Sequence, residues 1–208
     1  KNDAMERMFY PGGFQGNGVI GATQEFVNAF PMANGRPISD PLSGYDPYNP
    51  YQGRDPRFYS TIFYNTAIAK RISGSPAIMY TFENWSEGPT VGKDAAGVSP
   101  HNSLTNYHIK KFIFMGLNWS DATINRQPHS KFFIRWAHMC LIFAEAANQV
   151  AGPLDESTYG MSAKTAIQYL RARKTTDDNP GLSAIVPEPA DNYLNEVASA
   201  GKIEFDEL

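Results

Sequence analysis

Cysteine is nearly absent from the sequence, since Cys140 is the only one among 208 residues. A single cysteine excludes an internal disulfide, so cysteine usage gives no information on the redox compartment. Cys140 falls on the apolar face of a predicted helix, where a free thiol packs as a small apolar group. We therefore predict an inert core residue at this position, without a nucleophilic or metal-binding role.

Basic runs and long apolar runs are also lacking. The net charge is −3 and Lys and Arg are not clustered, which argues against a nucleic-acid partner. No apolar stretch approaches the ~18 residues that a transmembrane helix needs. The chain starts at Lys1 without an initiator Met or a targeting pattern, and we expect it to be a piece of a longer protein.

Patterns typical of catalysis are missing as well. The four histidines, at positions 101, 108, 129 and 138, lack metal-ligand spacing, and there is no Ser or Cys nucleophile motif and no Gly-rich phosphate loop. A glycosidase needs two carboxylates about 5–9.5 Å apart. No spacing forces any two of the candidate carboxylates together, namely Asp46, Asp55, Glu83, Glu87 and Asp94. We predict that the protein is not an enzyme and has no metal site and no cofactor.

The most regular feature that is present is a long apolar helix pattern at 131–149, KFFIRWAHMCLIFAEAANQ. Apolar residues recur at spacings of three and four, which places them on one face. These residues are Phe133, Trp136, Cys140, Phe143 and Ala147. A second apolar row beside them predicts that the helix is sandwiched among other elements, with Trp136 in the core and His138 as a hydrogen-bonded interior histidine. Ser130 is the expected N-cap, and Gly152-Pro153 the expected end.

Three further helices are predicted. Thr23 can cap a short helix that ends near Phe30, and a weaker helix starts at Asp191. A helix at 162–174 has its apolar stripe at Ala163, Ala166, Ile167 and Leu170. The helices at 131 and 162 start about 31 residues apart, close to the ~34-residue tetratricopeptide period, although two members alone do not establish a repeat.

Abundant Gly, Pro and aromatic residues predict long irregular loops around these helices. The pattern at 57–64 indicates a strand with both faces covered, and the pattern at 107–114 a weaker strand. Asn34-Gly35 is a hairpin signal, and Pro47, Pro50 and Pro56 each follow Asp or Asn and start a turn. The stretch at 69–103 is the least regular part.

Five segments point to a known family. The most specific is YDPYNPYQGRDPRFYSTIFYN at 45–65; the others are ATQEFVNAFPMANGRPI at 22–38, TNYHIKKF at 105–112, RWAHMCLIFAEAANQVAGP at 135–153 and AIQYLRARKT at 166–175. In this order they resemble segments of the SusD/RagB family of outer-membrane nutrient-binding lipoproteins. Two positions depart from the family pattern: His138 stands where Glu is usual, and 198–208 lacks an arginine cluster. Tyr45, Tyr48 and Tyr51 lie in the most specific segment, and we expect them to have a structural role.

The resemblance implies a mainly α fold of tetratricopeptide-like helical pairs, an α/α superhelix, with long irregular loops and a few short strands. It implies a loop-rich ligand-binding part at 1–130 and a helical scaffold at 131–208, with the family's N-terminal helices missing from this chain. It also implies a non-catalytic outer-membrane protein, facing the exterior on a lipid anchor outside this chain, that delivers glycan to a SusC-like TonB-dependent transporter. Two alternatives stay open: a peptide-binding member of the family, and a helical-repeat module that binds another protein.

Sugar binding without catalysis requires a flat aromatic face for the apolar side of the ring and amides or carboxylates for its hydroxyl groups. The segment YTFENWSE at 80–87 supplies both kinds of group. We predict Trp85 as the platform, with Tyr80 beside it and Trp119 as a weaker candidate. The expected partners of the hydroxyl groups are Glu83, Asn84 and Asp94.

Overall fold

The computed structural model describes residues 8–12, 16–71, 78–113, 132–172 and 192–208, with only the backbone at 69–71 and 78–80. The chain divides into two compact units. The first comprises the described residues of Lys1–Phe30 and Pro56–Ser130, and the second those of Pro31–Asp55, Lys131–Thr176 and Ser183–Leu208. Helices dominate, and the strands in the described ranges have at most four residues. The prediction of a mainly α fold with helical pairs, long loops and a few short strands is confirmed.

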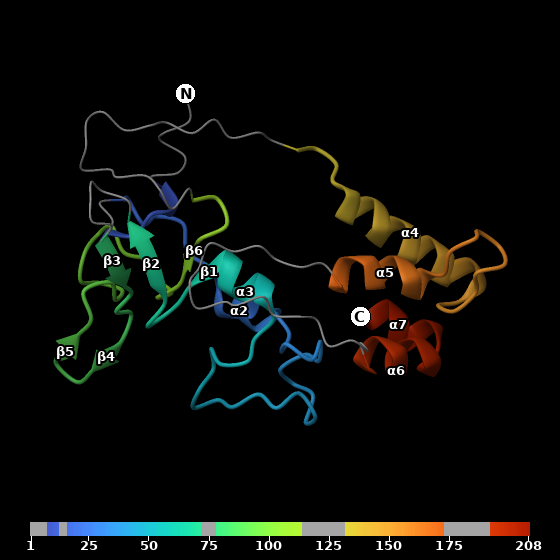
Figure 1. Cartoon of the computed structure of the whole chain (residues 1–208). Helices are drawn as coiled ribbons and strands as arrows, with labels where there is room; N and C mark the ends of the chain where they lie inside the picture. The colour runs from blue at the N-terminus through green and yellow to red at the C-terminus, as the bar shows by residue number, and fades with distance from the viewer. Residues whose placement is uncertain (1–7, 13–15, 72–77, 114–131, 173–191) are drawn as a thin grey trace. The chain divides into compact units, whose positions relative to one another are not determined.

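The second unit contains α4 (Trp136–Ala151), α5 (Ala163–Arg171), α6 (Asn192–Ala200) and α7 (Lys202–Glu207). Helix α4 lies alongside α5 and contacts α7, while α6 contacts both α5 and α7 (Figure 1). Small side chains predominate in their common core, which lets the helix backbones approach closely. The core residues are Cys140, Ala144, Ala147, Ala163, Ala166, Leu194, Ala198 and Phe205. None of the helices in the described ranges combines the length and apolar composition needed to cross a bilayer.

The helix ends agree with the sequence patterns at most positions. Ser162 caps α5, where its Oγ accepts a hydrogen bond from Thr165 N at 3.2 Å. Gly152 ends α4 with φ of 90°, in the left-handed region that glycine adopts without strain. The predicted N-cap Ser130 is wrong, because α4 starts later, with Arg135 as its N-cap. His138 is exposed instead of interior, and its Nδ1 accepts a hydrogen bond from Arg135 N at 3.4 Å.

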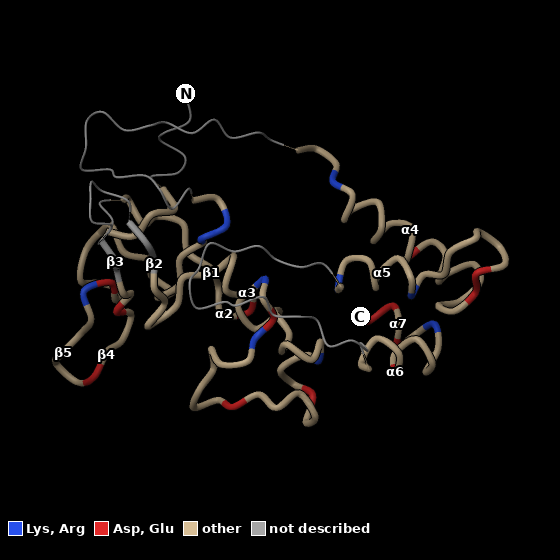
Figure 2. The backbone as a smooth tube through the Cα atoms, viewed as in Figure 1, with Lys and Arg blue, Asp and Glu red and all other residues tan. Residues whose placement is uncertain are grey.

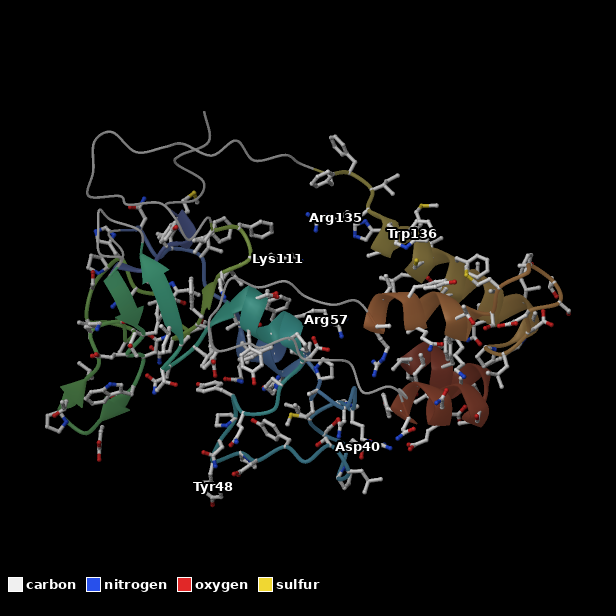
Figure 3. The ribbon with its side chains drawn as sticks, viewed as in Figure 1. Asp40, Tyr48, Arg57, Lys111, Arg135 and Trp136 are labelled. Carbon is white, nitrogen blue, oxygen red and sulfur yellow. The ribbon has the colours of Figure 1, made fainter. Side chains whose placement is uncertain are left out.

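The surroundings of α4 differ from the prediction. Its buried row contains Cys140, Ala144 and Ala147, whereas Trp136, in the first turn, is 68 % exposed (Figure 3). The prediction that Trp136 is a core residue is therefore wrong. Met139 and Ile142 on the same helix are also exposed. The described residues of the unit thus cover one face of α4 and leave a second apolar face open, because the alanine row is the face that packs on α5.

Among its described residues, the first unit contains the short helices α2 (Gln24–Asn28) and α3 (Pro56–Thr61) and antiparallel strand pairs. The pairs are β1 (Ile62–Phe63) with β6 (His108–Ile109), β2 (Ile68–Arg71) with β3 (Ile78–Thr81), and β4 (Ser86–Glu87) with β5 (Thr90–Val91). Phe63 and Phe82 stack at 4.4 Å between ring centroids and form the centre of the core with Tyr10 and Ala67. The buried Phe82 immediately precedes Glu83, Asn84 and Trp85 in the chain, so this core anchors the start of the segment that carries them.

The prediction of a strand at 57–64 is wrong, because most of this segment is α3. Pro56 is the first residue of α3, a position that suits its fixed φ and its missing amide proton. Phe58 and Thr61 are buried at a spacing of three, as on one face of a helix. Aromatic residues at alternating positions of the segment are also compatible with a strand that is covered on both faces, but the strand is limited to Ile62 and Phe63.

Other local predictions are confirmed in part. Thr23 caps α2 through its Oγ1, which accepts a hydrogen bond from Phe26 N at 3.2 Å. The turn at Asn34-Gly35 is present, but Met32 pairs with Arg54 in an isolated bridge instead of forming a regular hairpin. Of the strand predicted at 107–114, the described residues 107–113 form β6 alone.

Residues Pro31–Asp55 belong to the helical unit, although the sequence placed them in the loop-rich part. The Arg36 guanidinium binds Asp40 Oδ2 at 2.8 Å and Glu196 Oε1, on α6, at 2.5 Å. Arg171 of α5 donates a hydrogen bond to Gly35 O at 3.1 Å. These contacts tie the segment to both helices. The assignment of ligand binding to 1–130 stays a prediction.

Candidate ligand-binding site

The predicted platform residue Trp85 lies at the base of the β4–β5 hairpin, which projects from the rest of its unit (Figure 1). Gly92, opposite Trp85, donates a hydrogen bond to Trp85 O at 2.8 Å. A Cβ at Gly92 would overlap the Glu83 carbonyl oxygen, so only glycine allows the two arms to approach this closely. The Trp85 side chain is 37 % exposed, and both residues of β4 are exposed.

Buried polar side chains hold the base of this hairpin. Asp94 is fully buried, and its Oδ2 accepts a hydrogen bond from Glu83 N at 3.0 Å. Asn84 is also buried: its amide N donates to Asn65 Oδ1 at 3.0 Å, and its Nδ2 donates to Asn106 O. Buried polar groups are stable only when they are hydrogen-bonded, so this network determines the backbone path on either side of Trp85.

The surface beside Trp85 carries an ion pair. Glu83 Oε1 lies 3.0 Å from Lys93 Nζ, and both side chains are more than 40 % exposed. An exposed pair of this kind contributes little to stability, at most about 1 kcal/mol. It does place a carboxylate acceptor and an ammonium donor, both open to solvent, on the two arms that lead into the hairpin.

The structure brings four of the six predicted site residues together and gives them different surroundings. Trp85 and Glu83 reach the surface, whereas Asn84 and Asp94 face the protein backbone. Of Tyr80 only the backbone is described, paired with Ala69 between β3 and β2. Trp119 lies outside the described residues. The binding role of all six remains a prediction.

The sequence did not indicate a binding role for two side chains that the structure exposes. Lys93, the partner of Glu83, was not among the predicted site residues, although its position next to Asp94 placed it near the hairpin. Tyr48 was expected to be structural, but it is 93 % exposed. The Asp-Pro and Asn-Pro pairs on either side of Tyr48 predict turns, and this pattern was the sequence signal for an ordered loop.

The two carboxylates at the hairpin base both have partners within the described part of the chain. Of the two carboxylates at the hairpin base, Asp94 is occupied by a backbone amide and Glu83 by Lys93. Within the described ranges, no group of three or more His, Cys, Asp or Glu side chains is placed to hold a metal ion.

Comparison with known proteins gives one family. The model of the SusD family matches residues 2–205. No curated protein matches the chain. Among solved structures, a SusD-like protein from Bacteroides fragilis is similar at 21 % identity with a TM-score of 0.46, over 93 % of this chain and 34 % of that chain. This chain therefore spans about a third of that relative's length. Because the family match extends over nearly all of the sequence, the chain belongs to the SusD family.

Proposed function

We propose that this protein is a non-catalytic glycan-binding protein, an exterior-facing lipoprotein of the outer membrane that delivers oligosaccharides or polysaccharides to a SusC-like TonB-dependent transporter. The observation that carries the proposal is the family match over residues 2–205, because SusD membership supports a nutrient- or glycan-binding role at the cell surface in general terms. The kind of ligand, the transporter and the lipid anchor are the parts of the proposal that experiments must test.

The hairpin geometry supports Trp85 as the contact for a sugar ring. A tryptophan that is partly open to solvent can contact the apolar side of a pyranose with its indole ring. Glu83 and Lys93 next to it offer an acceptor and a donor for hydroxyl groups. The backbone at this point is held by Asn84 and Asp94, so little ordering is needed on binding. In this proposal Asn84 and Asp94 hold the site in shape, and Tyr80 and Trp119 are further candidate ligand contacts.

The test is binding to a panel of oligosaccharides, first on a glycan array and then by isothermal titration calorimetry. Trp85→Ala is expected to weaken the affinity about tenfold or more, since loss of an aromatic contact of ~1.4 kcal/mol has that effect. Trp136→Ala is the matched control, because Trp136 is also exposed but lies in the other unit. Its affinity should equal that of the wild type.

Three results would contradict the proposal. Binding of peptides but no glycans would indicate a peptide-binding protein. Glycan binding that is equally strong in Trp85→Ala would move the site away from the hairpin. Release of reducing ends from a polysaccharide, above the rate in buffer and lost in a Glu83→Gln variant, would indicate a hydrolase.

A further inference from the structure

The chain that enters the hairpin alternates between buried and exposed residues. Phe82 and Asn84 are buried, whereas Glu83 and Trp85 reach solvent. Successive side chains of an extended segment point to opposite sides, so Glu83 and Trp85 lie on the same outer side of this arm. A sugar in contact with the Trp85 side chain therefore has the Glu83 carboxylate as a neighbour.

Positive charge is scarce around this surface. In the segment 78–107, which contains the hairpin and both of its arms, Lys93 is the only Lys or Arg (Figure 2). The same segment contains the acidic residues Glu83, Glu87 and Asp94. Glu87 is exposed in β4, two residues beyond Trp85. The charged side chains that are exposed next to Trp85 along the hairpin are thus two carboxylates and one ammonium group.

The ammonium group is already engaged by a carboxylate. Lys93 Nζ lies 3.0 Å from Glu83 Oε1. This pair neutralises the positive charge at the base of the hairpin, and the carboxylate of Glu87 gives the surface an excess of negative charge. An anionic ligand at Trp85 would find its cation occupied and a second carboxylate nearby.

Neutral and acidic sugars would meet this surface differently. The hydroxyl groups of a neutral sugar donate hydrogen bonds to a carboxylate such as that of Glu83, while the apolar side of the ring contacts Trp85. The carboxylate of a uronic acid cannot donate in this way. It would compete with Glu83 for Lys93, and Glu87 would repel it.

We propose that the hairpin selects neutral oligosaccharides against uronic-acid glycans, and that Glu83 and Glu87 determine this specificity. Glu83 acts by occupying Lys93, and Glu87 acts by repulsion. Specificity is a difference between two affinities, and a charge directed against the wrong ligand increases that difference. The inference rests on the proposed function, because it requires that a glycan binds at Trp85.

The test compares oligosaccharides that differ only in charge, by isothermal titration calorimetry. Manno- and gluco-oligosaccharides are paired with mannuronate and glucuronate oligomers of the same linkage and length, and methyl-esterified galacturonate oligomers with the free acids. The neutral and uronic-acid members of the glycan array extend the comparison. The wild type should bind neutral members about tenfold or more tightly than acidic ones at low salt, and the ratio should fall at high salt because salt screens the charges.

Glu87→Gln removes a carboxylate and keeps the size of the side chain. Its affinity for the acidic oligomers should rise about threefold at low salt, and its affinity for the neutral ones should not change, because Glu87 acts only through its charge. Glu25→Gln is the matched control, since Glu25 is exposed on α2 in the same unit. An equal rise in both variants would mean that only the net charge of the protein matters, and would overturn the role of Glu87.

Glu83→Gln takes the carboxylate away from Lys93. Because Glu83 also accepts from sugar hydroxyl groups, the readout is the ratio of acidic to neutral affinity, which should rise about tenfold at low salt. The rise should disappear when Lys93→Gln is added, because the ammonium group is then absent. A rise that persists in the double variant would overturn the role of the ion pair. The melting temperature should stay the same, since an exposed pair contributes little to stability.

Failure of this inference differs from failure of the proposed function. A wild type that binds acidic oligomers as tightly as neutral ones overturns the selectivity and leaves glycan binding intact. A wild type that binds no glycan overturns both. Glycan binding that is unchanged in Trp85→Ala moves the site away from the hairpin, and the inference falls with it.

Discussion

At the scale of single residues, His108 is the clearest case of a side chain whose surroundings change its chemistry. It is fully buried in β6, opposite Phe63, with its ring 6.4 Å from that of Phe82. Its Nε2 accepts a hydrogen bond from Ser103 N at 3.4 Å, which a doubly protonated ring could not do. Burial lowers the pKa of His108 to about 4.

This burial predicts that the protein loses stability in acid. The unfolded chain has a histidine pKa of about 6.5, so it binds a proton that the folded protein excludes. The free energy of unfolding should be undiminished above pH ~6.5 and should fall as the pH drops towards 4, by up to about 3 kcal/mol. Urea unfolding at several pH values checks this.

The variant His108→Gln should show a shallower fall over the same pH range, although it is less stable at pH 7. His101→Gln is the control, since His101 is exposed, and its pH dependence should equal that of the wild type. An equal slope in wild type and His108→Gln would show that other groups cause the acid sensitivity.

The sequence was enough to predict which residue types gather at the candidate site, but not which of their side chains are exposed to solvent. Glu83, Asn84, Trp85 and Asp94 are close together because they lie within a short stretch of chain. Their sequence positions could not distinguish the buried Asp94 from the exposed Glu83, because that depends on backbone amides brought together by the hairpin. Trp136 was misjudged for the same reason, since the apolar spacing of its helix does not reveal whether a neighbour covers it.

At the scale of elements, α4 contains a pair of adjacent alanines in opposite surroundings. Ala147 is buried against the neighbouring helices, whereas Ala146 is exposed. Leucine has nearly the same helix propensity as alanine, so a change to leucine mainly tests packing.

We expect Ala147→Leu to destabilise the protein by about 1–3 kcal/mol, because added methylene groups overfill a close helix contact. Ala146→Leu should change stability by less than about 0.5 kcal/mol. Urea unfolding of the two variants gives both values. Similar losses would contradict the buried assignment of Ala147, and a stabilised Ala147→Leu would indicate a cavity at this contact.

Element type was predictable where the apolar spacing was regular and the ends were marked. Helix α5 satisfies both conditions, with Ser162 at its start and Ala163 and Ala166 inward. Helix α3 does not, because it is short and surrounded by aromatic residues that are compatible with either period. Helix α7 was not predicted, because it follows α6 after a single residue, Gly201. It is stabilised by the burial of Phe205 and by contacts with α4 and α6.

At the scale of the molecule, the second face of α4 predicts self-association of this chain. Met139, Ile142 and Val150 lie exposed at spacings that suit helix packing, and Trp136 adds to the same apolar surface. Exposed apolar patches of this kind favour association. Light scattering should therefore show a mass that rises with protein concentration.

Ile142→Lys should reduce this rise, because it places a charge in the middle of the patch. Gln168→Lys adds the same charge at an exposed polar position of α5, away from this face of α4, and should have a smaller effect. A wild-type mass that stays monomeric at all concentrations would contradict the prediction.

The sequence by itself determined the family, the predominance of helices and the positions of α5 and α6, because local spacing, caps and family segments are properties of the chain itself. It also identified the aromatic and polar residues of the hairpin. Only the tertiary structure decided which of them reach solvent, that 57–64 is mainly helix and that the Tyr48 side chain is exposed. The physical reason is that burial and hydrogen bonding depend on groups distant in the chain, such as Asn65 and Asn106 around Asn84.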